Sequence, residues 1–330
     1  MSNGFSSKRA SDPTVRPARH RVSVVITFFN SERFLAEAID SVLAQDFRDF
    51  ELILVDDGST DRSSEIACGC VRRGGGKVLY LEHDGHTNRG ISASRNLGVG
   101  AASGEYIAFI DADDVWLPRK LSEQVVLMDE HPELGIVAGT ARYWYSWANG
   151  EDVLIPTGHV QDRTIFPPEA LLLVYPLGNA AAPCNDFLIR SELLHRLGGF
   201  EEQFTGMYED QALLVKLYLS APVYFSTRVW LNYRQHPDSC VTSATREGIY
   251  HDVRLYFLTW FEQYLAASKE ASDPRIVAAL NRALRPYRHP RLHTLLSIPR
   301  RMRGALGKLK RRVRCWARSK SRAGDLEEIS

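Results

Sequence analysis

The first hundred residues alternate between short apolar runs and amphipathic stretches. Three apolar runs, Arg21–Phe29, Glu51–Val55 and Lys77–Leu81, have the composition of strands, and the first two are nearly continuous, as in strands covered on both faces of a sheet. The order strand, helix, strand predicts a βαβ unit with parallel strands. The helix between the first two runs is expected to start at a cap on Asn30 or Ser31, because apolar side chains then recur at helical spacing, at Phe34, Leu35, Ala38, Ile39, Val42 and Leu43.

A fourth apolar run, Glu105–Asp114, ends in three carboxylates, those of Asp111, Asp113 and Asp114. A buried strand here would carry the acids to its carboxyl end, where open α/β sheets bind ligands. An Asp-x-Asp spacing at that place suggests Mg²⁺ or Mn²⁺, which prefer oxygen ligands and keep positions open for water and substrate phosphates. The alternative is a solvated turn in which Asp114 caps a helix that begins near Pro118.

Polar residues also follow the second strand and the third. The stretch 56–61, DDGSTD, can offer a carboxylate to a base N–H or a ribose hydroxyl, and Gly58 lets the backbone approach a ligand closely; the alternative is a capped turn before a helix over Asp61–Val71. The next helical stretch carries Arg95, whose guanidinium suits a diphosphate because its fork donates two parallel hydrogen bonds. A structural ion pair is the alternative reading of Arg95.

The second half of the chain continues the mixed pattern. An apolar helix is expected from about Tyr208, and the acids Glu209 and Asp210 in its first turn are explained, by themselves, by the helix dipole. From Arg246 onward the pattern is helical. The other predicted elements are a helix over Leu121–Met128 and strands over Gly135–Gly139, Val223–Phe225 and Val229–Arg234.

Length and composition narrow the class of protein. The chain has 330 residues, 44% hydrophobic and 25% charged, which favours one large α/β domain with an appendage, or two domains, of an ordinary globular protein. No apolar run approaches the roughly 20 residues of a membrane span. Residues 1–20 lack the apolar core of a secretory signal and are expected to be a disordered lead-in. Five cysteines without a zinc-binding spacing suggest reduced thiols and a cytoplasmic protein.

The net charge of +1 conceals a basic C-terminal segment. Residues 285–322 contain 14 Lys and Arg and no acid. The alternatives to a membrane contact are docking on the chain's own domain or on a partner, and a nucleic-acid patch. We expect residues 291–320 to lie on an anionic membrane surface as an amphipathic helix, because apolar side chains recur three or four residues apart at Leu295, Ile298, Met302, Leu306, Leu309, Val313 and Trp316.

Taken together, the motifs resemble the family-two nucleotide-sugar glycosyltransferases. The resemblance implies an α/β fold, a single glycosyltransferase A-type Rossmann-like domain with a mostly parallel central sheet, over residues 21–240. Its nucleotide-binding half would span about 21–115 and its acceptor half about 116–240, with a helical C-terminal extension over 241–330. The segments that carry the resemblance are Ser23–Asn30, Glu51–Asp61, Asn88–Gly98, Asp111–Asp113, Gly198–Phe200, Tyr208–Asp210 and Tyr233–His236.

The resemblance also implies roles for individual residues. Asp210 would be the general base, and Asp113 and His236 would hold Mn²⁺ or Mg²⁺. The resemblance places the donor nucleotide on Thr27, Phe29, Asp57, Arg95 and Asp111, although Phe29 lacks the hydroxyl of the Tyr that is common at its position. Contacts with the donor sugar or the acceptor are expected from Asp114, Trp116 and Glu209.

The implied activity is metal-dependent, inverting transfer from a nucleotide-sugar, with a UDP-sugar as the expected donor, to a glycan or lipid-linked glycan. Polysaccharide or cell-envelope glycan synthesis on the inner face of the plasma membrane would suit this activity, and no nucleic-acid partner is expected. A nucleotidyltransferase is one alternative, but such an enzyme should carry a Gly-rich phosphate loop where this chain has Thr27–Asn30. A non-catalytic scaffold is the other, and it has no use for Asp113 together with Asp210.

Overall fold

Four parallel strands form the first half of one sheet. They lie in the order β3-β2-β1-β4, so β1 is central and pairs in parallel with both β2 and β4. The predicted βαβ unit is therefore confirmed. The four strands are β1 (His20–Phe28), β2 (Phe50–Asp56), β3 (Val78–Glu82) and β4 (Gly104–Asp111).

The computed structural model describes residues 20–74, 76–158, 160–181, 185–237, 244–268 and 273–291. The predictions for the N-terminal lead-in before residue 20 and for the basic segment after residue 291 lie outside the described residues. The chain divides into two compact units, Met1–Ala279 and Leu280–Ser330. Apart from α10, which crosses the boundary between the two units, the structural features described below belong to the first unit.

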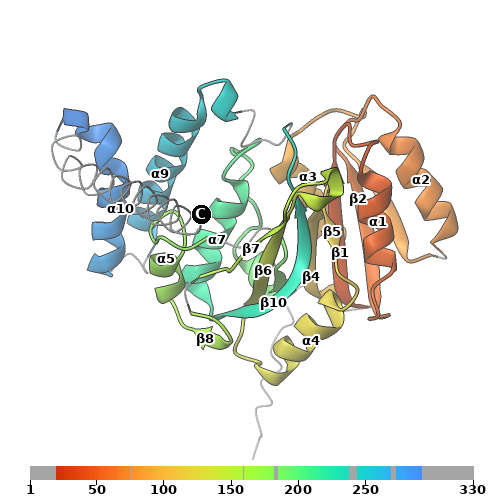
Figure 1. Ribbon diagram of the computed structural model, residues 1–330, viewed down its shortest axis with the longest axis horizontal. Coiled ribbons are helices and arrows are strands. Elements are labelled where there is room, and N and C mark those ends of the chain that lie inside the picture. Colours follow the sequence, from red (N-terminus) through yellow and green to blue (C-terminus); the bar gives the residue numbers. More distant parts are fainter. Residues whose placement is uncertain are drawn as a thin grey trace, which may run out of the picture. The chain divides into compact units, whose positions relative to one another are not determined.

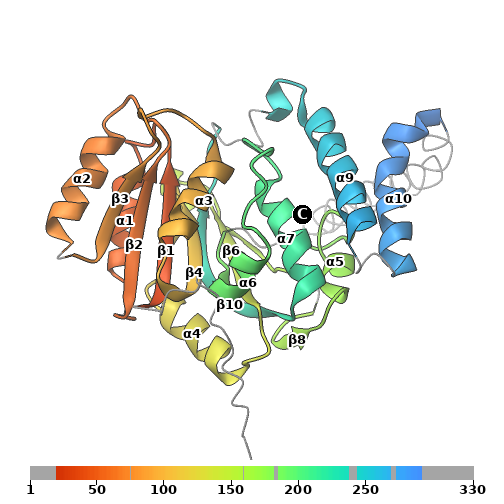
Figure 2. The same cartoon turned by 180° about the vertical axis from the view of Figure 1, so that it is seen from behind.

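Helices cover both faces of the parallel strands. Figure 1 shows α1 (Leu35–Leu43) and α2 (Ser63–Arg73) on one side of β1 and β2, and Figure 2 shows α3 (Ile91–Ala101) on the other. Strand side chains alternate between the two faces: Val24 and Ile26 join the cluster packed under α1, whereas Val25 meets α3. Helix α3 lies very close to the sheet, because a Cβ atom on Gly98 would be 2.5 Å from Val25 Cγ1.

The second half of the sheet mixes both strand directions. Strand β9 (Leu188–Arg190) joins β4 to β6 (Ile136–Trp144) by antiparallel pairing, and β6 runs parallel to β10 (Val223–Arg234). Each antiparallel pair includes a strand of only two or three residues, and the long strands pair with one another in parallel, so the expected mostly parallel sheet is confirmed. The remaining strands are β5 (Val115–Trp116) and β8 (Arg163–Ile165), both on β10, and β7 (Val153–Ile155) on β6.

Two boundary predictions were wrong. Helix α1 begins at Leu35 and not at Asn30 or Ser31, because Asn30 has a φ of +47° and its side chain accepts a hydrogen bond from the N–H of Thr60 instead. The two strands expected between Val223 and Arg234 form one strand, β10, whose register against β6 shifts on both sides of Val229.

The other helices lie between the later strands of the sheet or, for α9 and α10, after its last strand. No helix in the described segments combines the length and the hydropathy needed to cross a bilayer. The helices not yet named are α4 (Lys120–Glu130), the 3₁₀ helix η1 (Ser146–Ala148), α5 (Glu169–Leu173), α6 (Ser191–Arg196), α7 (Glu209–Ser220), α9 (Tyr250–Ala267) and α10 (Pro274–Arg288).

Candidate active site

The carboxyl ends of the parallel strands gather the polar residues that follow them. Thr27, near the end of β1, pairs with Asp111, the last residue of β4. Phe29 comes directly after β1 and is 47% exposed. Because the strands are parallel, their ends meet at one edge of the sheet, where open α/β folds bind ligands. The structure thus places these three residues at a common edge, as the sequence predicts.

Asp57 organises the loop before α3. Its carboxylate accepts hydrogen bonds from the backbone N–H groups of Arg89, at 2.7 Å, and Gly90, at 3.0 Å. Gly58 has a φ of +81°, and a Cβ atom on it would lie 2.8 Å from the backbone nitrogen of Asn88. Asp57 and Gly58 therefore fix this loop against the end of β2. A carboxylate has about four lone-pair sites, so these two bonds leave Asp57 capacity for a further donor.

Arg95 forms the centre of a buried ion-pair network. Its guanidinium donates to Asp111 Oδ1 at 2.8 Å and to Glu209 Oε1 at 3.1 Å, and it lies over the ring of Phe200. The residue is only 1% exposed. The structural ion pair that was the alternative reading of Arg95 is thus present, and it joins the end of β4 to the start of α7. Burial raises the pKa of Asp111, and the charge of Arg95 opposes that shift.

Asn185 completes the surroundings of Asp111. Its amide nitrogen donates to Asp111 Oδ2. The next residue, Asp186, is buried and accepts from the N–H of Gly139 at 2.7 Å, while its backbone oxygen accepts from the side chain of Gln124 at 2.6 Å. Asn185 was not among the predicted site residues, and its one signal in the sequence is a pair of polar residues directly before an apolar strand.

Asp113 and His236 face each other at the end of the sheet. His236 Nε2 lies 2.9 Å from Asp113 Oδ2, and the Asp113 side chain is 36% exposed. Two ligands at neighbouring corners of an octahedral Mg²⁺ site, with bonds of roughly 2.0–2.1 Å, would be about 3 Å apart. The pair therefore fits a divalent cation. No group of three or more His, Cys, Asp or Glu suited to a metal exists among the described residues, so water or substrate would fill the other corners.

Asp114 and Trp116 lie inside the protein. Asp114 accepts a hydrogen bond from the N–H of Arg234 at 2.9 Å, and burial together with Asp113 and Asp111 raises its pKa well above the usual value. Asp114 does not cap α4, which begins at Lys120 without a side-chain cap. Trp116 is 2% exposed and belongs to the hydrophobic core. Neither side chain is placed at an open surface.

Arg234, which the sequence analysis did not single out, holds the turn that carries the acids. Its Nε donates to the backbone oxygen of Asp113 at 2.6 Å, and its Nη2 donates to Glu37 at 2.5 Å. The guanidinium lies 4.5 Å from the ring centre of Phe34 and 4.4 Å from that of Trp144. Arg234 thus links the end of β10 to the Asp113 turn.

Asp210 lies in the first turn of α7, beside the ion-pair network. Burial and the charge of Glu209 raise its pKa to about 7, against the opposing effect of Arg95. Its Oδ1 accepts from the N–H of Gln211 at 2.6 Å. A general base works best when its pKa lies near the working pH, so Asp210 has the acidity that proton abstraction near neutral pH requires.

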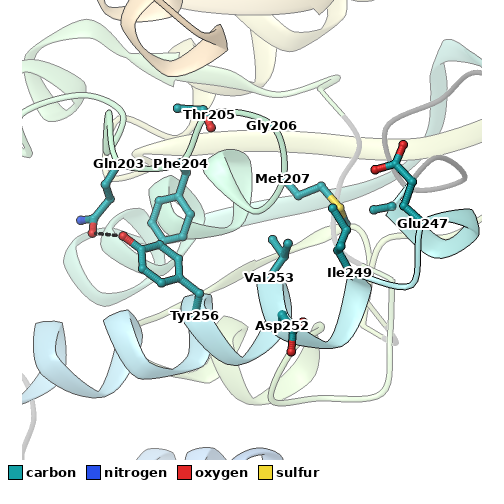
Figure 3. A pocket seen from close by; sticks show the side chains of 11 residues that line it. Gln203, Phe204, Thr205, Gly206, Met207, Glu247, Ile249, Asp252, Val253 and Tyr256 are labelled. Atoms are coloured by element: carbon teal, nitrogen blue, oxygen red, sulfur yellow. Dashed lines mark hydrogen bonds between the residues drawn. The ribbon is translucent and has the colours of Figure 1, made fainter.

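A pocket of about 510 Å³ lies between the loop before α7 and helix α9 (Figure 3). Phe204 and Met207 line it from the loop, and Val253 and Tyr256 line it from α9. The loop runs directly into Tyr208, Glu209 and Asp210. Helix α9 lies beyond residue 240, where the acceptor half is expected to end, so part of the wall of this pocket comes from the C-terminal extension.

The known proteins that are similar in sequence to this chain are named as glycosyltransferases. A sequence model described as "Glycosyl transferase family 2" matches residues 23–197, more than half of the chain. "Uncharacterized glycosyltransferase alr2836" of Nostoc sp. is 38% identical over 179 residues, which is 54% of this chain and 53% of that protein. "Putative glycosyltransferase EpsE" of Bacillus subtilis is 38% identical over 117 residues, 36% of this chain and 41% of that protein. The matches therefore span about half or less of these relatives.

Solved structures share the fold. S. aureus TarS 1–349 in complex with UDP-GlcNAc superimposes with a TM-score of 0.65 at 22% identity, over 83% of this chain and 75% of that one. The same TarS fragment in complex with UDP gives a TM-score of 0.62 at 19% identity, over 83% and 75% of the two chains. At this identity the likeness shows the α/β architecture.

Proposed function

Because the chain belongs to glycosyl transferase family 2, we propose that it moves a sugar from a nucleotide-sugar to a hydroxyl group of an acceptor, with inversion at the anomeric carbon. The proposal rests mainly on one observation. Asp210, with a pKa raised to about 7, follows Glu209, which the buried Arg95 joins to Asp111 at the sheet edge. The proposed base therefore directly follows a residue of the buried network that reaches Asp111, the proposed donor-side carboxylate.

The donor is proposed to be a UDP-sugar. TarS, which shares the fold, was solved with UDP and with UDP-GlcNAc. In this chain the exposed ring of Phe29 offers a face for stacking on the base. Thr27 lies at the same edge, and Asp57 can still accept an N–H from the base. Arg95 is buried, so we propose that it serves the donor by fixing Asp111 toward the ribose instead of touching the diphosphate itself.

The proposed chemistry needs one proton transfer. Asp210 accepts the proton of the acceptor hydroxyl while that oxygen attacks the anomeric carbon from the face opposite the leaving nucleoside diphosphate. The transition state should resemble an oxocarbenium ion, as in other glycosyl transfers. Asp113 and His236 would hold Mn²⁺ or Mg²⁺, which would supply positive charge to the departing diphosphate. Arg234 keeps the Asp113 turn in place for this role.

The acceptor and the cellular setting extend the same proposal. We propose a glycan or lipid-linked glycan acceptor in polysaccharide or cell-envelope synthesis. A cytoplasmic enzyme bound to the inner face of the plasma membrane through residues 291–320 would suit that acceptor. This segment lies outside the described residues, apart from Arg291.

The test is Asp210→Asn, which keeps the size of the side chain and removes the base. UDP release from UDP-GlcNAc with Mn²⁺ should fall by at least about 10²-fold, the usual contribution of a general base, while UDP binding measured by calorimetry stays unchanged. The matched control is Asp40→Asn on the exposed side of α1, which should behave like the wild type. Full activity in Asp210→Asn would contradict the base assignment.

A further inference from the structure

Tyr208 has an unusual backbone conformation directly before the proposed base. Its φ is +68° and its ψ is 7°, in the left-handed region, which bulky L-residues rarely adopt. Such a conformation costs free energy and persists only where the surrounding contacts determine it. Tyr208 is also the residue before the first turn of α7, and its backbone oxygen accepts the first helical hydrogen bond, from the N–H of Ala212 at 2.8 Å. The conformation of Tyr208 thus sets the direction in which the first turn leaves the loop.

Helix α9 contacts the Tyr208 side chain directly. The rings of Tyr208 and Phe257 are stacked, with centres 4.8 Å apart and planes inclined by 13°. Both residues are buried. Stacked aromatic pairs prefer a narrow range of geometry, so Phe257 restricts the rotation of the Tyr208 ring and, with it, the backbone to which the ring is attached.

A second route from α9 reaches the hydroxyl of Tyr208. That hydroxyl lies 2.7 Å from the hydroxyl of Tyr175, which follows α5 in the chain. Tyr175 in turn accepts from Arg254 Nε at 3.0 Å and lies 3.4 Å from the hydroxyl of Tyr250. Arg254 and Tyr250 both belong to α9. The ring and the hydroxyl of Tyr208 are therefore both tied to the same helix.

The turn that these contacts fix carries both acids of the network. Glu209 is bonded to Arg95, and Asp210 comes next. A rotation of the first turn would move Asp210 and would strain the Glu209–Arg95 bond at the same time. Displacement of a catalytic group by about 1 Å can cost about 10²-fold in rate, so the position of this turn has consequences for catalysis.

We propose that Tyr208, held by α9 through Phe257 and Tyr175, is a positioning residue for Asp210. This inference rests on the proposed role of Asp210 as the base. Helix α9 lies outside residues 23–197, the stretch matched by the family model. The C-terminal extension of this chain therefore takes part in arranging the catalytic turn.

The main test is Tyr175→Phe, which removes the hydroxyl bridge and keeps the ring. With UDP-GlcNAc and Mn²⁺, kcat of donor hydrolysis should fall at least about tenfold, while KM for the donor stays within about twofold. The matched control is Tyr106→Phe near the start of β4, whose hydroxyl donates to Asp129 Oδ1 at 3.0 Å. This control should keep the wild-type kcat. An unchanged kcat in Tyr175→Phe, or a rise in KM alone, would overturn the proposal.

A double variant distinguishes an effect of Tyr175→Phe on the position of Asp210 from a general loosening of the fold. In an Asp210→Asn background, Tyr175→Phe should cause no further loss, because it acts through the missing carboxylate. An additional tenfold loss there would overturn the proposal. If Asp210→Asn alone were fully active, the proposed base would fail instead, so the two failures can be told apart.

Hydrogen exchange provides a readout that needs no substrate. The amides of residues 209–213 should exchange faster in Tyr175→Phe and in Phe257→Leu than in the wild type, because the first turn of α7 opens more easily. Tyr106→Phe should leave this exchange unchanged. Equal exchange in all four proteins would mean that α9 does not hold the turn.

Discussion

The surroundings of Asp210 have opposing effects on its pKa. A base must be charged, but burial and the neighbouring Glu209 disfavour its charged form and raise its pKa to about 7. Arg95 limits this rise, since its guanidinium is bonded to Glu209 and lies close enough to lower the pKa of Asp210. The pKa of Asp210 thus depends on the charges of Glu209, Arg95 and Asp111.

The raised pKa predicts how activity depends on pH. Donor hydrolysis should increase with pH and level off above about 7, where Asp210 is deprotonated in the folded protein. The measurement is UDP release as a function of pH in wild type and in Asp40→Asn, which should share one profile. A profile that levels off near the ordinary carboxylate value of 3.8 would mean that Asp210 is not the group that titrates.

The same shift predicts a cost in stability. The folded protein retains a proton on Asp210 at pH values where the unfolded chain has lost it, so this group lowers the free energy of unfolding as pH rises from about 4 to about 7. Asp210→Asn should therefore melt at a higher temperature than the wild type at about pH 8, and the difference between the two proteins should be smaller at about pH 5. A melting difference that does not change between these pH values would contradict the shift.

Arg95 should matter for stability as well as for activity. Arg95→Met leaves Asp111 and Glu209 without their buried partner, and breaking a buried ion pair costs about 3–5 kcal/mol. The matched control is Arg228→Met, which removes an exposed ion pair with Glu123 and should cost about 0–1 kcal/mol. Urea unfolding of the two variants measures the difference, and equal losses would show that the Arg95 network is not a stability centre.

At the scale of elements, the contact between α3 and the sheet brings Arg95 to the site. Gly98 permits this contact, because a Cβ atom on it would meet Val25 at 2.5 Å, whereas a Cβ atom on Gly100 in the same helix would meet nothing beyond the local backbone within 4 Å. Arg95 lies one turn before Gly98. The distance between helix and sheet therefore decides whether its guanidinium reaches Asp111.

Two glycine variants test this packing. Gly98→Ala should lower the free energy of unfolding by about 1–3 kcal/mol through overpacking, and it should also reduce donor hydrolysis by moving Arg95. Gly100→Ala should raise the free energy of unfolding by about 0.4–1 kcal/mol, because alanine restricts the unfolded chain and meets no obstacle. Thermal and urea unfolding measure both. A stabilising Gly98→Ala would contradict the close packing of α3.

At the scale of the whole molecule, local pattern predicted the parallel strands and the acids at their ends. Strand content and helical spacing are local properties, so β1, β2, β4 and the Asp113 turn could be placed from the sequence. Asn185 and Arg234 could not, because they meet Asp111 and Asp113 across 74 and 121 positions of the chain. The contact of α9 with Tyr208 spans the 49 positions from Tyr208 to Phe257, so no local pattern predicts it either.

The long-range contacts also explain why Arg95 and Asp57 have partners in the structure that the sequence did not predict. Arg95 was expected at a diphosphate because guanidinium suits phosphate, but folding brings two carboxylates to it first. Asp57 was expected at a base, and two backbone N–H groups occupy part of its capacity. In both cases the residue type indicated which kind of group the side chain can bind. The partner that it binds in the structure depends on how the edge of the sheet is arranged.

The most direct measurement of the central proposal is thermal stabilisation by a panel of UDP-, GDP-, dTDP- and CMP-linked sugars, with Mn²⁺ and with EDTA. A ligand that binds only the folded protein raises its melting temperature. We expect a rise with UDP-sugars and Mn²⁺ that is lost with EDTA and in Asp113→Ala, and retained in Asp40→Asn. No rise with any donor, or a rise that is the same in EDTA and in Asp113→Ala, would contradict a metal-dependent nucleotide-sugar site at this edge of the sheet.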